Sequence, residues 1–169
     1  MRQQLSTDTV ERRINATPEA LYAIVADVTR TPELTDDIVS CHWLDGATGA
    51  AVGVRFRAVN RQGRGPDWKN SPVMTKVSPG REIAWARTER FAGTVEWRYR
   101  FEPDDGGTRV IESYRVTKPL SVVGWFIIGN VYGLKDRQGD LHRSMVATLE
   151  RLERLAVSDA PSTEWNRPA

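Results

Sequence analysis

The sequence predicts a single α+β domain, in which about six to seven antiparallel strands form a curved sheet around one long C-terminal helix. Three observations lead to this fold class. A capped amphipathic segment follows residue 17, segments of alternating apolar residues run from residue 38 to residue 117, and an apolar stripe at helical spacing occupies residues 141–156. Consecutive strands followed by a long helix are typical of α+β proteins.

The N-terminal part predicts one edge strand and then one or two short helices. Residues 7–15 carry few apolar side chains, as edge strands do. Thr17 is a preferred N-cap, Pro18 suits the first helical position, and Glu19 complements the helix dipole. The Thr31-Pro32 pair then ends this helix or begins a second one.

Alternating side chains between residues 38 and 117 predict the rest of the sheet. Val95, Trp97, Tyr99 and Phe101 alternate with charged residues, which is the pattern of a half-buried strand. Turn signals that contain Gly or Pro separate the segments. The other predicted strands are residues 38–44, 52–58, 67–77 with a bulge near 71–72, 82–88 and 108–117.

The C-terminal segment predicts a long helix and then a tail. Leu141, Met145, Leu149, Leu152 and Ala156 form one apolar stripe, which must be buried against the sheet. A sheet curved around this helix leaves space between the two, and we expect a ligand site in that space. The domain is expected to span residues 1–157, and the polar residues 158–169 are expected to form a flexible tail.

Composition narrows the class of protein. The 24 Lys and Arg against 22 Asp and Glu give a net charge of +2, so no broad basic surface is expected for nucleic acid. Cys41 is the only cysteine, which excludes an internal disulfide. The polar N-terminus does not resemble a signal peptide, and no apolar run reaches the roughly 20 residues of a membrane span. We therefore expect a soluble cytoplasmic protein.

Six stretches of the sequence, taken in order, resemble the START-like (SRPBCC) superfamily, and most closely its bacterial polyketide cyclase/dehydrase and lipid-transport branch. Each stretch is a short helix, strand or turn sequence, and the resemblance lies in their order within residues 10–155. The stretches are residues 16–28, 43–46, 52–56, 79–82, 97–101 and 106–110.

The resemblance implies the helix-grip fold and a hydrophobic small-molecule ligand, such as a lipid, sterol or polyketide, held in an internal cavity. A carrier without catalytic activity is the leading hypothesis. The alternative is an enzyme of the cyclase/dehydrase type that moves protons in the same cavity. The sequence predicts neither an organic cofactor nor a metal.

Glu112 is the main candidate for acid/base chemistry. It alternates with Val110 and Tyr114, so it faces the cavity if these apolar side chains do. A carboxyl group buried there has a raised pKa and can donate or accept a proton. Tyr114 is a second candidate for this role. The alternative for Glu112 is an ion pair with an arginine of a neighbouring strand, or exposure through a bulge.

Aromatic side chains are the candidates for contacts with a hydrophobic ligand, although such rings also fill ordinary cores. Asn60 and Asn70 lie where a polar group of a ligand can be held. The predicted ligand-binding residues are Trp43, Phe56, Trp68, Trp85, Trp97, Tyr99 and Met145.

No other motif predicts catalysis. His42 and His142 stand in no arrangement typical of a nucleophile–base pair or a zinc helix, and Cys41 does not complete a metal site. The glycine-containing turns lack the Lys-Ser/Thr pair of a phosphate-binding loop.

The apolar residues 122–132 have three interpretations that the sequence leaves open. They form a helical turn buried against the end of the sheet, a lid over the cavity with glycines as hinges, or an exposed patch that contacts a membrane or a second copy.

Overall fold

The computed structural model describes residues 6–63, 65–89, 93–133 and 136–160. Its helical elements are α1 (Pro18–Ala26), the 3-10 turn η1 (Val28–Arg30), α2 (Thr31–Leu34), α3 (Val122–Phe126), the π-helical turn η2 (Ile127–Val131) and α4 (Arg137–Ser158). Its strands are β1 (Thr7–Ile14), β2 (Ile38–Trp43), β3 (Phe56–Asn60), β4 (Trp68–Asn70), β5 (Val73–Ser78), β6 (Glu82–Glu89), β7 (Gly93–Asp104) and β8 (Gly107–Lys118).

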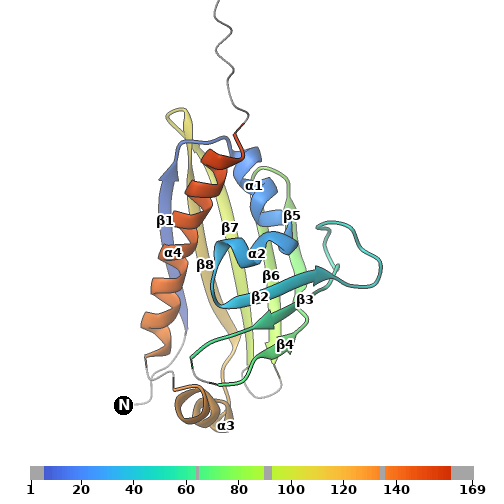
Figure 1. Cartoon of the computed structure of the whole chain (residues 1–169), viewed down its shortest axis with the longest axis vertical. Helices are drawn as coiled ribbons and strands as arrows, with labels where there is room; N and C mark the ends of the chain where they lie inside the picture. Colours follow the sequence, from blue (N-terminus) through green and yellow to red (C-terminus); the bar gives the residue numbers. More distant parts are fainter. Residues whose placement is uncertain (1–5, 64, 90–92, 134–135, 161–169) are drawn as a thin grey trace, which may run out of the picture.

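The strands form two antiparallel sheets, where the sequence predicts a single one. Five strands lie in the order β1-β8-β7-β6-β5, and three lie in the order β2-β3-β4. The α+β class with a curved antiparallel sheet is confirmed (Figure 1). The sheets are joined before β3, where the Gly53 amide donates to the Met74 carbonyl (2.8 Å) and the Met74 amide donates to the Val54 carbonyl (2.9 Å).

The strand predicted at residues 52–58 begins later than expected. β3 starts at Phe56, and Val52 is 66% exposed. Gly53 has a φ of +86°, a left-handed conformation that glycine adopts without steric cost, and the Val54 amide donates to the Ala51 carbonyl (3.0 Å). The chain therefore turns at these residues before it enters the smaller sheet.

β7 and β8 form a long hairpin that is the centre of the larger sheet. Asp105 and Gly106 have φ values of 42° and 78°, which fits the two-residue turn that best matches the twist of paired strands. Tyr99 and Phe101 are buried on the inner face, while Arg98 forms ion pairs with acidic residues of β6 and β7. Alternation thus gives the sheet one apolar face and one charged face.

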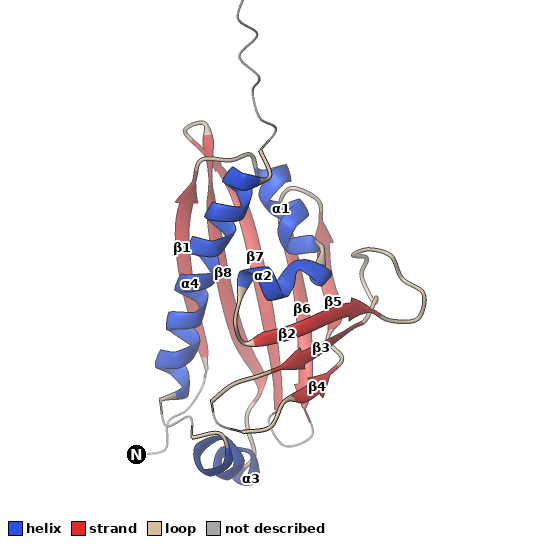
Figure 2. Ribbon diagram, in the orientation of Figure 1, coloured by secondary structure: helices blue, strands red, loops and turns tan. Residues whose placement is uncertain are grey.

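The helices α1, α2 and α4 and the smaller sheet lie on the apolar face of the larger sheet (Figures 1 and 2). α1 starts as expected, because the Thr17 hydroxyl accepts a hydrogen bond from the Ala20 amide (3.2 Å) and Pro18 occupies the first helical position. Its side chains Leu21, Ile24 and Val25 are buried in the core between the layers.

α4 buries the predicted stripe against this face beside β1 and β8. Leu141, Met145, Leu149 and Leu152 are each at most 4% exposed. The helix extends to Ser158, and residues 161–169 of the predicted tail lie outside the described residues. Among the described helices, none is long and apolar enough to cross a membrane.

Candidate functional site

A pocket lies between the larger sheet, the smaller sheet, α2 and α4. It contains about 840 Å³ of space, part of which is open to solvent. Elements from residue 25 to residue 148 contribute to its wall, so only the folded chain forms it. The apolar lining consists of Val25, Leu34, Ile38, Cys41, Phe56, Ala58, Pro72, Trp85, Trp97, Tyr99, Leu141 and Met145.

Five of the predicted ligand-binding residues line this pocket and two do not. Phe56, Trp85, Trp97, Tyr99 and Met145 are part of the wall. The Trp85 and Tyr99 rings stack with centroids 5.7 Å apart, and the Phe56 ring meets Trp85 edge to face at 6.0 Å. These contacts hold the aromatic wall in a fixed arrangement.

Trp43 and Trp68 are placed outside the pocket lining. Trp43 packs edge to face on Phe56 at 6.0 Å and so supports the wall from behind. Trp68 packs against Tyr132 at 5.1 Å, and its indole nitrogen donates to a Glu89 carboxylate oxygen (3.2 Å). Alternation alone does not distinguish a ring that lines a pocket from one that packs behind it.

Glu112 lines the pocket and is 3% exposed. The Tyr99 hydroxyl donates a hydrogen bond to its Oε1 (2.6 Å), whereas its Oε2 has no hydrogen-bond partner among the described residues. Burial raises the pKa of Glu112 to about 8, and the bond from Tyr99 opposes this only in part. At neutral pH the carboxyl is therefore mostly protonated, with one oxygen unpaired.

Tyr99 and Tyr114 differ in their relation to the pocket. Burial, and then the neighbouring Glu112, raise the pKa of Tyr99 well above its usual value. Tyr114 is 1% exposed and packs against Trp97, outside the pocket lining. Burial raises the pKa of Tyr114 to about 12, so both hydroxyls keep their protons at neutral pH and Tyr99 is the one in contact with a pocket carboxyl.

The polar lining contains groups of both charges. Asn60 and Asn70 line the pocket, and the Asn70 Oδ1 has no hydrogen-bond partner among the described residues. Asp37, Arg87 and Arg137 complete the charged lining. The remaining polar side chains of the wall are Thr31, Thr35, Gln62, Ser144 and Thr148.

Sequence reasoning missed the pocket arginine Arg137, although a signal was present. Arg137 precedes Leu141 by four residues and therefore continues the buried stripe of α4 by one turn. An arginine in register with a buried stripe predicts either a buried ion pair or a binding group. The sequence contains no comparable signal for Asp37, which lies in a loop, or for Arg87, whose position depends on the bulged pairing of β6 with β5.

The histidines and the cysteine form no catalytic or metal arrangement in the described part of the chain. His142 pairs through Nδ1 with Asp8 (2.9 Å) on the outside of α4. Burial raises the pKa of Cys41 to about 11, which keeps its thiol protonated. No cluster of three metal-binding side chains occurs among the described residues.

Residues 122–131 form α3 and η2 at the end of the larger sheet, and Tyr132 follows them. Val122, Val123 and Phe126 are 68%, 54% and 64% exposed, so these side chains are not buried as the first interpretation requires. Tyr132 lies so close to Gly65 that a side-chain carbon there would be 2.2 Å from its ring. This segment thus packs against the smaller sheet at Tyr132 and turns an apolar face to solvent.

Comparison with known families gives one match. The sequence profile of a family described as polyketide cyclase/dehydrase and lipid transport matches residues 7–156. No curated protein matches the chain significantly.

Several solved structures share the fold. The polyketide-cyclase-like protein Cgl2372 from Corynebacterium glutamicum is 25% identical, with a TM-score of 0.56, over 99% of this chain and 100% of its own. TTHA0849 from Thermus thermophilus is 20% identical, with a TM-score of 0.66, over 92% and 99%. StfQ, a di-domain ARO/CYC of the steffimycin biosynthetic pathway, is 12% identical, with a TM-score of 0.70, over 90% and 51%.

Proposed function

The chain belongs to the polyketide cyclase/dehydrase and lipid transport family, and on this premise we propose that it binds, and carries, a hydrophobic small molecule such as a lipid, sterol or polyketide in the pocket beneath α4. The observation that carries the proposal is the pocket itself. Its aromatic and aliphatic wall supplies the apolar contact that drives binding, and a few polar groups fix the orientation of the ligand.

Filling the pocket tests this function. Met145 is 1% exposed and faces the pocket, whereas its neighbour Val146 is 39% exposed on the outer side of α4. We expect Met145→Trp to abolish the uptake of hydrophobic compounds measured by native mass spectrometry, because the indole occupies the ligand's space. The control Val146→Trp adds the same ring to the surface and is expected to bind as the wild type does.

The outcomes of this comparison are distinct. Equal uptake by the two variants, with both folded by circular dichroism, would show that the ligand is not held in this pocket. A wild-type protein that takes up no compound from a panel of lipids, sterols and aromatic polyketides would contradict the binding function itself.

A second candidate function is catalysis of the cyclase/dehydrase type, and Glu112 favours it. A protonated carboxyl with one unpaired oxygen in an apolar pocket can donate a proton to a ligand oxygen, and its conjugate base can remove one from carbon. The Tyr99 hydroxyl holds the other oxygen in place. Here Glu112 would be the acid/base group and Tyr99 its positioning residue. The second predicted acid/base residue, Tyr114, is not among the residues that line the pocket.

Two interpretations of residues 122–132 remain after the buried one is excluded for Val122, Val123 and Phe126. We propose that α3 contacts a membrane surface or a second copy through these exposed side chains, because large apolar side chains grouped on a surface mark interaction sites. The lid interpretation is supported by the contacts of Tyr132 with Trp68 and Gly65. The cytoplasmic location stays a prediction from the sequence.

A further inference from the structure

We propose that the ligand is an amphipathic acid whose single anionic group, of the carboxylate type, pairs with the guanidinium of Arg137 inside the pocket. This inference rests on the proposed function, because it names the chemistry of the ligand bound in the same pocket.

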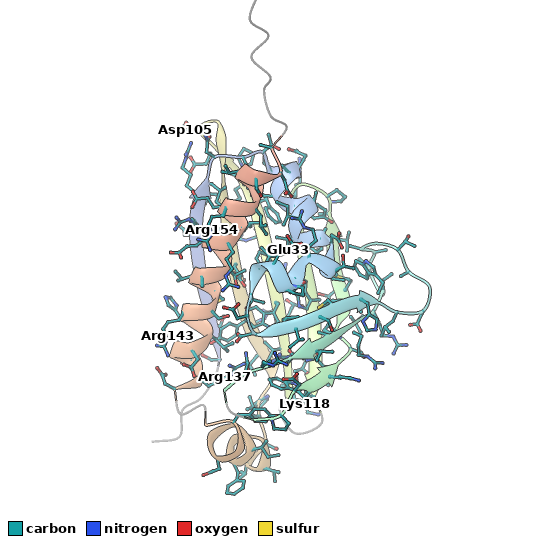
Figure 3. The ribbon with its side chains drawn as sticks, in the orientation of Figure 1. Glu33, Asp105, Lys118, Arg137, Arg143 and Arg154 are labelled. Carbon is teal, nitrogen blue, oxygen red and sulfur yellow. The ribbon has the colours of Figure 1, made fainter. Side chains whose placement is uncertain are left out.

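Arg137 is a buried cation without a partner among the described residues. It is 6% exposed, it is the first residue of α4, and it lines the pocket. No hydrogen bond or ion pair joins its guanidinium to any other described residue. Figure 3 shows Arg137 at the beginning of α4, toward the Lys118 end of the larger sheet. Burial lowers the pKa of Arg137 to about 10, so the group stays charged at neutral pH.

Three features of this position disfavour a positive charge. The side chain loses its hydration on burial, it lies at the positive end of the α4 dipole, and Arg87 is a like charge in the same pocket. Asp37 and Asp140 favour the charge, but their effects rank below those of burial and of Arg87. Asp37 accepts a hydrogen bond from Ser144 (2.9 Å), and Asp140 pairs with Arg143.

The buried acid of the pocket lining, Glu112, does not neutralise Arg137. Glu112 is bonded to Tyr99 and mostly protonated at neutral pH, and it is not among the groups that shift the pKa of Arg137. Tyr114, two residues further along β8, is the residue of this strand that interacts electrostatically with Arg137. An unpaired charge this deeply buried lacks the compensation that buried charges need, and a bound anion supplies it.

The charge balance of the pocket selects a monoanion with an apolar body. Arg87 already pairs with Glu89 (3.3 Å), which leaves one cation free among the described lining residues. A carboxylate matches this single charge and the planar fork of a guanidinium, whereas a phosphate dianion would bury one uncompensated charge. Trp97, Leu141 and Met145 provide the apolar wall for the rest of the ligand.

A pair of probes that differ in charge and by one methyl group tests the inference. We would measure the Kd of 4-(1-pyrenyl)butyrate and of its methyl ester by fluorescence titration. The wild type is expected to bind the acid about tenfold or more tightly than the ester, since hydrogen bonds to charged groups are the stronger ones. Arg137→Gln is expected to bind the acid and the ester with similar affinity, and Arg137→Lys to retain part of the preference for the acid.

Arg143→Gln is the matched control, because it removes the same charge from a 65% exposed position of the same helix. It is expected to keep the preference for the acid. Removal of an unpaired buried charge is not expected to lower the melting temperature, so the Arg137→Gln protein should be folded in this assay.

The outcomes separate the two proposals. Equal affinity of the wild type for acid and ester, or an unchanged preference in Arg137→Gln, overturns the assignment of an anionic group and leaves the pocket function standing. Failure of the wild type to bind either probe contradicts the proposed function, and the inference with it.

Discussion

At the scale of single residues, the environment of Glu112 makes the stability of the protein depend on pH. Its pKa is about 8 in the folded chain against 4.5 for an ordinary glutamate, so between these values the folded state holds a proton that the unfolded state has released. The free energy of unfolding therefore falls as pH rises from about 5 to 8, by about 1.4 kcal/mol per pH unit at most.

Glu112→Gln isolates this contribution. The amide oxygen can still accept the hydrogen bond from Tyr99, but it does not titrate. We expect urea unfolding of the variant between pH 5 and pH 8 to show a weaker decline in stability than the wild type, because all other titrating groups are shared. Parallel pH profiles would mean that Glu112 is ionised in the folded state. If the protein is an enzyme that uses Glu112, the variant also loses turnover while still binding the ligand.

At the scale of elements, α4 stabilises the fold through one face only. Leu149 is 1% exposed and lies outside the pocket lining, whereas Val146, three residues earlier, is 39% exposed. Leu149→Ala should lower the free energy of unfolding by about 3 kcal/mol, through lost burial and the space left behind. Val146→Ala should change it by less than about 0.5 kcal/mol, since exposed substitutions usually do.

Urea denaturation of the two α4 variants measures this difference. Similar losses of stability would contradict the assignment of the buried face. The same helix also contributes Leu141, Met145 and Arg137 to the pocket, so its buried face lines the pocket near its N-terminal end and packs in the core along the rest of its length.

At the scale of the whole molecule, the exposed face of α3 is a candidate for contacts with other surfaces. We expect the double variant Val123→Asp, Phe126→Asp to take up ligand from dilute solution as the wild type does, because neither residue lines the pocket. It should lose whichever contact the wild type makes, with phospholipid vesicles in a flotation assay or with a second copy in size-exclusion chromatography.

Val157→Asp serves as the control for this surface, because Val157 is 70% exposed but lies near the other end of α4. It is expected to change neither flotation nor oligomeric state. A double variant that matches the wild type in both assays would leave α3 without a role in surface contacts.

The fold class and most element boundaries follow from local physics and could be read from the sequence. Thr17 and Pro18 set the start of α1, the turn at Asp105 and Gly106 sets the long hairpin, and the stripe from Leu141 sets the buried face of α4. Each of these signals acts within a few residues of the chain, so it is visible without knowledge of the neighbours in space.

The tertiary structure alone decided which side chains meet. The division of the strands into two sheets depends on pairing between residues 53–54 and Met74, which periodicity does not encode. The same holds for the place of Trp43 and Trp68 outside the pocket lining and for the Glu112–Tyr99 bond. The clearest case is Arg137, which has no ion-pair partner among the described residues. Whether a charge is paired depends on all the residues packed around it, and these come together only in the folded chain.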